Sequence, residues 1–116
     1  MQMLLEPLTM RLVQDGYLPN LAKLIDQGSA NQAVSSFPAW TPTNWATIST
    51  GANTGTHGVF NWFVDLPEGD PVSSFDSHAV SAETFWAAAE RAGLKSAVFH
   101  YPASMPSELK HNFIIE

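Results

Sequence analysis

The chain has 116 residues, which is enough for one modest domain with a hydrophobic core of its own. Its 11 acidic residues outnumber its 5 Lys and Arg, and the formal net charge of −6 argues against non-specific nucleic-acid binding, which needs clustered basic residues. It contains no cysteine, so disulfide scaffolds, thiolate zinc sites and cysteine nucleophiles are excluded.

The first two predicted elements are amphipathic helices. Residues 4–15 place apolar side chains near one helical face, and Gly16 then suits a left-handed C-terminal cap. A second helix is favoured between Pro19 at its entry and Gly28 at its exit. Its apolar face consists of Leu21, Leu24 and Ile25. No apolar run approaches the length of a membrane span, and the opening MQMLLEPLTMRL does not resemble a secretory signal, so we expect no membrane partner and leave the location unknown.

A short strand and a third helix are predicted next. The stretch SANQAVSSF, residues 29–37, is moderately apolar and is predicted to be a strand. The following segment, FPAWTPTNWATISTG, predicts a helix over residues 42–50, with Thr41 as its N-cap and Pro42 as its first residue. We expect Trp45 and Ile48 to face the core. Judged by its local sequence alone, Thr41 is no more than a helix cap.

The second half of the chain alternates loop, helix and strand. Residues 51–80 are rich in Gly, Pro, Asp and Ser and predict a long loop with an aromatic cluster, VFNWFV, in its middle. The stretch SAETFWAAAERAG predicts a helix capped by Ser81, with Phe85, Ala89 and Ala92 inward and Gly93 at its end. The stretches KSAVFHYP and HNFIIE predict a buried strand and a second short strand. Helix, short loop and apolar strand in this order indicate an α/β fold with a mainly parallel sheet.

Four motif elements fall at spacings typical of one enzyme family. They are an LPNLAKLIDQG helix, Thr41 with Asn44 three residues later, Thr50-Gly51, and His57-Gly58. In this respect the chain resembles the type I phosphodiesterase/nucleotide pyrophosphatase family of the alkaline phosphatase superfamily. The resemblance continues more weakly through residues 81–92 and AVFHYPASMP, so it covers most of the chain.

The resemblance implies a fold and a reaction. It implies part of a three-layer αβα sandwich, and metal-dependent hydrolysis of phosphodiester or pyrophosphate bonds in small phosphate-ester or nucleotide substrates. Two divalent metal ions, usually zinc, would lie at the site, and Thr41 would be both the nucleophile and a ligand to one of them. Attack by Thr41 would give a phospho-threonine intermediate, and Asn44 would donate its side-chain amide to a non-bridging phosphate oxygen.

The other metal ligands of the family have no matching positions in this sequence. Asp15 lies at the end of the first helix, where the family's first ligand precedes that helix, and the four histidines fall in no ligand motif. We expect His57 to form hydrogen bonds in a loop beside the site and His100 to end a strand. The chain is therefore expected to be a single partial domain, 1–116, of a larger hydrolase, with impaired activity when isolated and self-association through uncovered sheet edges.

Other assignments remain open or are less favoured. A non-catalytic fragment or interaction module would keep the fold without hydrolysis, and a related phosphomutase or phosphonate hydrolase would use the same threonine. The aromatic side chains are expected mainly in the core, although Trp62 and Phe63 lie in the long loop, where a stacking role for a nucleotide base stays open. The acids between 65 and 76 have no regular ligand spacing, which favours a solvated loop.

Overall fold

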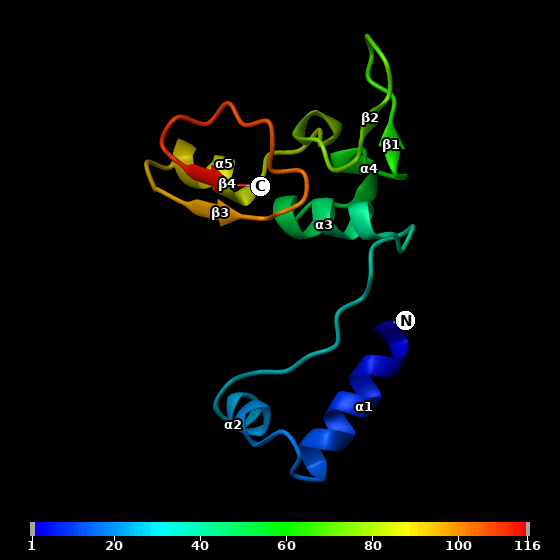
Figure 1. Ribbon diagram of the computed structural model, residues 1–116, viewed down its shortest axis with the longest axis vertical. Helices are drawn as coiled ribbons and strands as arrows, with labels where there is room; N and C mark the ends of the chain where they lie inside the picture. The colour runs from blue at the N-terminus through cyan, green and yellow to red at the C-terminus, as the bar shows by residue number, and fades with distance from the viewer. Residues whose placement is uncertain (1, 116) are drawn as a thin grey trace. The chain divides into compact units, whose positions relative to one another are not determined.

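The computed structural model describes residues 2–115, with side chains from residue 7 onward. By its contacts the chain divides into two compact units, one extending to Val34 and the other beginning at Ser35. Figure 1 shows the helices and strands of each unit. Among the described residues, no helix has both the length and the apolar character needed to cross a membrane.

The first unit contains the two predicted helices, α1 (Gln2–Gln14) and α2 (Pro19–Gln27). Gly16 adopts a φ of +80°, and its amide donates to Val13 at 3.1 Å, which confirms the predicted left-handed residue after α1. Pro19 is the first residue of α2, as predicted, since its fixed φ suits a helix start and its missing N–H is not needed there.

The predicted strand at residues 29–37 is wrong. The segment is irregular, and Val34 is 98% exposed. A strand needs a neighbour for its backbone hydrogen bonds, and no ladder partner for this segment occurs in the described residues.

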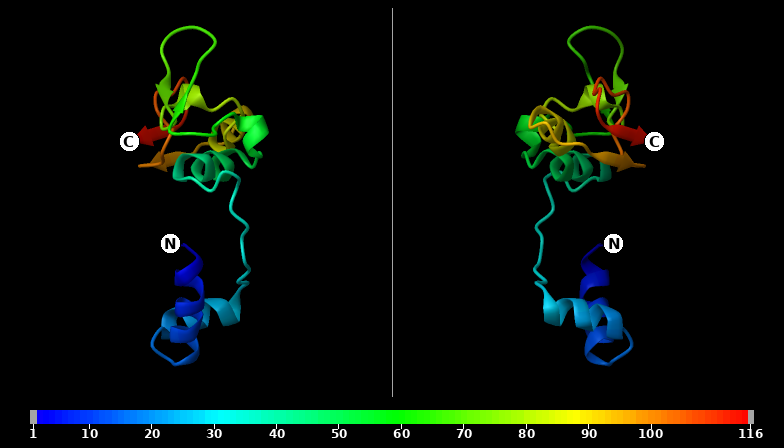
Figure 2. Two further views of the ribbon diagram at one scale, coloured as in Figure 1. Left: turned by 90° about the vertical axis from the view of Figure 1, so that its right-hand side faces the viewer. Right: turned by 90° about the vertical axis from the view of Figure 1, so that its left-hand side faces the viewer.

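The second unit contains four helical and four extended elements. The helical ones are α3 (Thr41–Thr50), α4 (Thr54–His57), the 3₁₀ helix η1 (Ser77–Ala79) and α5 (Phe85–Arg91). Strands β1 (Phe63–Val64) and β2 (Val72–Ser73) form an antiparallel pair, and β3 (Ala97–Phe99) and β4 (Phe113–Ile115) form a parallel pair. The loop between β1 and β2 projects from this unit in each view (Figures 1 and 2).

The parallel pair is consistent with the α/β assignment and confirms that both predicted C-terminal segments are strands. The expectation that the first is a buried strand is wrong, because Ala97 and Phe99 are exposed. Val98 opposes Ile114 in the register, and Val98 is the buried residue of β3. The crossover between the strands is fixed to α5 by Glu90, whose carboxylate accepts hydrogen bonds from the Lys110 and His111 amides at 3.1 Å each and from Asn112 Nδ2 at 2.8 Å. These hydrogen bonds hold the pKa of Glu90 below its ordinary value.

Two predicted details of the second unit are corrected. Residues 51–80 are not one loop, because α4, β1, β2 and η1 lie in this range. Helix α5 is capped by Thr84, whose hydroxyl accepts from Ala87 N at 3.4 Å, rather than by Ser81. The predicted inward face of α5 is wrong as well, since Phe85 and Ala92 are exposed and Trp86 is the buried residue.

The core of the second unit is small. Its central cluster is Ala46, Val59 and Ala79, against which three valines pack. Trp86 is buried as predicted, whereas Trp45, Trp62 and Phe63 are substantially exposed. Six polar residues are buried as well: Thr43, Ser49, Thr54, His57, Ser74 and Ser104.

Candidate functional site

Thr41 is the first residue of α3, not its N-cap as the sequence predicts. Trp40 is the N-cap, with extended backbone angles of φ −98° and ψ 155°, and its carbonyl accepts the first helical bond, from Asn44 N at 3.0 Å. The cap has no side-chain hydrogen bond. The threonine hydroxyl is therefore not used to close the helix end, and Thr41 is exposed.

The beginning of α3 presents unpaired backbone donors. Within the described residues, neither the Thr41 nor the Thr43 amide forms a hydrogen bond, and Pro42 between them has no N–H. Thr43 is 0% exposed, so the accessible donor at this end is the Thr41 amide. Free amides and the helix dipole together place partial positive charge at this end. An anion is the ligand that such an end binds best.

Asn44 lies one turn further along and fixes the approach to the helix. Its Oδ1 accepts from Ser35 Oγ at 3.0 Å and from Ser36 N at 3.2 Å, and its Nδ2 donates to Trp40 O at 2.9 Å. The amide nitrogen carries two hydrogens, so one remains for a further acceptor. Sequence reasoning missed the two serines, although a serine pair just before the Pro-rich approach is the signal that could have suggested them.

The two faces of α3 differ from the prediction. Trp45 is 37% exposed and Ile48 is 62% exposed, so the expectation that they face the core is wrong. The buried side chains are Pro42, Thr43, Ala46 and Ser49. Small and polar side chains turn inward because the helix packs closely on α4, and the face that carries Thr41 and Asn44 is left accessible.

Tyr101 joins this accessible face of α3 from the segment after β3. Its ring meets Trp45 edge to face, with centroids 5.1 Å apart, and its hydroxyl donates to Trp45 O at 2.9 Å. Burial raises the pKa of Tyr101 above its ordinary value, so the phenol stays protonated and remains a donor. His100, beside it, is the first residue after β3, one position beyond the predicted end of the strand, and adopts a φ of +49°.

His57 packs against the other side of α3. Its side chain is 0% exposed, at the end of α4 rather than in a loop, and Nε2 lies 3.0 Å from Thr47 Oγ1. Nδ1 accepts from Val59 N at 3.1 Å, so the ring proton is on Nε2 and is directed at the threonine hydroxyl. Burial lowers the pKa of His57 and keeps the ring neutral. The prediction that His57 forms hydrogen bonds near the site is confirmed.

Each of the two glycines of the motif directly follows a helix and adopts a left-handed backbone conformation. Gly51 after α3 has a φ of +66°, and Gly58 after α4 has a φ of +79°. A side chain at Gly58 would also approach Ser81 Oγ within 3.3 Å. The Thr50-Gly51 and His57-Gly58 pairs therefore determine where α3 and α4 end.

The described residues do not gather a two-metal centre around Thr41. Among them, no group of three or more His, Cys, Asp or Glu side chains is arranged to hold a metal ion. Asp15 belongs to the other unit, just after α1, and His78 pairs with Asp76. The residues present thus fit an anion-binding helix end but not the metal set that the resemblance implies.

Comparison with known proteins identifies the family. The family model described as type I phosphodiesterase/nucleotide pyrophosphatase matches residues 2–113. No curated protein and no solved structure matches the chain. Since the match spans both units and includes Thr41, Asn44 and the His57-Gly58 pair, the chain belongs to the type I phosphodiesterase/nucleotide pyrophosphatase family.

Proposed function

We propose that this chain carries the nucleophile of a hydrolase that cleaves phosphodiester or pyrophosphate bonds, and that Thr41 is that nucleophile. The observation that carries the proposal is the exposed position of Thr41 at the start of α3, with its own amide unpaired. Family membership supports the reaction class. The substrate would be a small phosphate ester or nucleotide.

The reaction is a two-step displacement at phosphorus. The Thr41 oxygen forms a bond to phosphorus as the bond to the leaving alcohol or phosphate breaks, and the hydroxyl proton is released. The Thr41 amide and the remaining Asn44 N–H donate to the non-bridging oxygens. Water then attacks phosphorus as the bond to the Thr41 oxygen breaks, and the phosphate or its monoester leaves. One water proton restores the Thr41 hydroxyl, and the proton released in the first step passes to the leaving alcohol or to solvent.

The two divalent ions, usually zinc, are part of the proposal for the whole protein. When bound they would supply positive charge and lower the pKa of the attacking hydroxyl, with Thr41 as a ligand from this chain. The described residues do not supply the remaining ligands.

We also propose that β3, β4 and α5 are part of a three-layer αβα sandwich and that residues 1–116 form one partial domain. The outer edges of the parallel pair lack ladder partners within the described residues, so the isolated chain should self-associate. Light scattering showing a monomer at all concentrations would contradict this.

The test uses bis-p-nitrophenyl phosphate with added zinc and the chain in excess over substrate. We expect slow p-nitrophenol release and a matching mass increase on the intact chain, both lost in Thr41→Ala and retained in Thr41→Ser. Asn44→Ala should slow release by about 10²-fold, the usual effect of one lost donor to a developing anion. A wild-type chain that neither releases product nor gains mass would argue against Thr41 as nucleophile.

A second candidate is a non-catalytic module that binds phosphate without hydrolysis. The lack of a metal set among the described residues favours it. Orthovanadate binding by wild type, weakened in Asn44→Ala, without any turnover, would support this candidate. A phosphonate or phosphomonoester substrate that is processed in place of the diester would instead indicate a related phosphonate hydrolase or mutase.

A further inference from the structure

A cavity lies in the unit that begins at Ser35, and its lining does not include Thr41. It has a volume of ≈ 430 Å³ and is bordered by η1, the first half of α5 and the segment after Tyr101. None of the residues that line it belongs to α3. The proposed hydrolysis therefore makes no use of this cavity.

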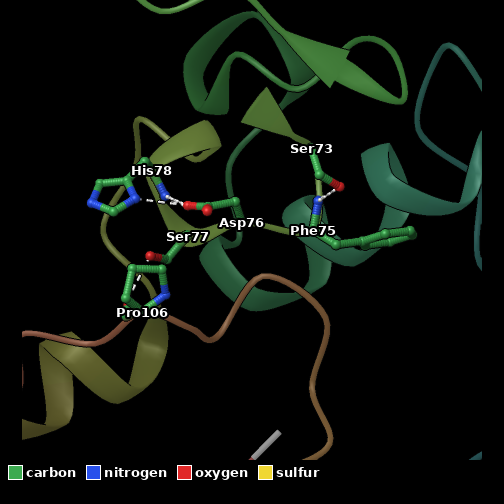
Figure 3. A network of polar contacts seen from close by, with 6 residues as sticks. All are labelled: Ser73, Phe75, Asp76, Ser77, His78 and Pro106. Carbon is green, nitrogen blue, oxygen red and sulfur yellow. Dashed lines mark hydrogen bonds and ion pairs between the residues drawn. The ribbon is translucent and has the colours of Figure 1, made fainter. Parts of the chain in front are cut away.

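One wall of the cavity is held rigid by hydrogen bonds to η1 (Figure 3). Ser77 N donates to Met105 O at 2.8 Å, and Ser77 Oγ donates to Pro106 O at 2.6 Å. Asp76 Oδ1 accepts from His78 N at 2.9 Å and lies 2.7 Å from His78 Nδ1. Because a carboxylate only accepts, His78 Nδ1 carries the proton of this hydrogen bond.

The charged groups that line the cavity are acidic. Glu83 and Glu108 line it together with His78, and no Lys or Arg does. Arg91 engages Glu83 through two hydrogen bonds of 2.9 Å. Glu108 is exposed and has no ion pair within the described residues. One carboxylate is therefore free to meet a positive charge.

The remaining lining combines apolar side chains with one buried hydroxyl. Val80, Trp86 and Leu109 supply the apolar surface. Ser104, which also lines the cavity, is 2% exposed, and its Oγ has no hydrogen-bond partner. A buried hydroxyl without a partner is uncommon, and a ligand in the cavity would supply the missing partner.

We propose that this cavity binds a small organic ammonium ion. Its charged nitrogen pairs with Glu108, and its aliphatic body lies against Trp86 and Leu109. Ser104 Oγ, which has no partner, is a further acceptor in the lining. Apolar walls favour an organic cation over a metal ion, which needs oxygen or nitrogen ligands on most sides.

Calorimetric titration of the full chain tests the proposal with three probes of equal length: pentylammonium, pentanol and pentanoate. We expect pentylammonium to bind more tightly than pentanol and pentanoate not to bind. Equal affinity for ammonium and alcohol, or no heat with pentylammonium at millimolar concentration, would overturn the proposal.

Matched variants locate the site. Glu108→Gln should weaken pentylammonium binding about two- to fivefold, the range for an exposed ion pair. Glu68→Gln, which removes the same charge from the β1–β2 loop, should leave it unchanged. If both variants weaken binding equally, the net charge of the chain attracts the amine and the cavity does not. Because neither variant touches α3, this result is independent of the hydrolysis assay.

Discussion

Replacing Thr47 by Val tests the support beneath the candidate site. The change removes the hydroxyl 3.0 Å from His57 Nε2 and keeps the shape of the side chain. The His57 ring is 0% exposed, so its N–H would be left without a partner in the interior. An unsatisfied buried donor costs about 1–3 kcal/mol. In a unit of this size that lowers Tm by roughly 5–15 °C.

Urea unfolding monitored by tryptophan fluorescence measures the loss. All four tryptophans lie in the unit that begins at Ser35, so the signal reports on the unit that contains His57. Thr47→Ser is the control, because it keeps the hydroxyl and loses only a methyl group. If Thr47→Val unfolds at the same urea concentration as Thr47→Ser, the hydrogen bond does not stabilise the fold and the reasoning fails.

Three further predictions concern the same unit. Burial lowers the pKa of His57, so the unfolded chain takes up its proton at about pH 6.5 before the folded chain does; stability should fall below pH 6.5, and a urea midpoint unchanged between pH 7.5 and 5.5 would contradict this. Glu90→Gln should lower Tm by weakening the bonds to the β3–β4 crossover, whereas Glu68→Gln should not, as thermal melts followed by circular dichroism would show. Thr43→Val should raise the free energy of unfolding by about 1 kcal/mol, because the Thr43 hydroxyl is buried without a partner; a loss of stability would mean that it has one.

Local signals predicted much of the fold. Pro19 at the start of α2, Gly16 after α1 and the apolar β3 and β4 segments depend on near neighbours in sequence, and these predictions are confirmed. Asn53 caps α4 by accepting from Thr56 N at 3.1 Å, and this Asn-x-x-Thr pattern would have revealed the helix inside the predicted loop.

Features that depend on tertiary partners were predicted poorly. The segment at 29–37 has strand-like composition but no neighbour to pair with among the described residues. The apolar residues Trp45 and Ile48 suggested one buried face of α3, yet close packing on α4 favours the small residues Ala46 and Ser49.

The candidate site also combines features that local sequence predicts with features that depend on tertiary contacts. Thr41 and Asn44 lie on one face because residues three apart in a helix are neighbours, which follows from sequence alone. The contact of Tyr101 with Trp45, and the serines that bond to Asn44, connect distant or irregular segments. Only the folded chain brings them together.

The absence of basic residues between Lys23 and Arg91 has a practical consequence for mapping the reaction. Trypsin cuts only after Lys and Arg, so it leaves Thr41 inside one long peptide that runs through both α3 and the β1–β2 hairpin. Chymotrypsin cuts after aromatic residues, and Trp40 and Trp45 bracket the start of α3. Digestion with chymotrypsin would release the pentapeptide TPTNW, in which fragmentation can distinguish a phosphate on Thr41 from one on Thr43.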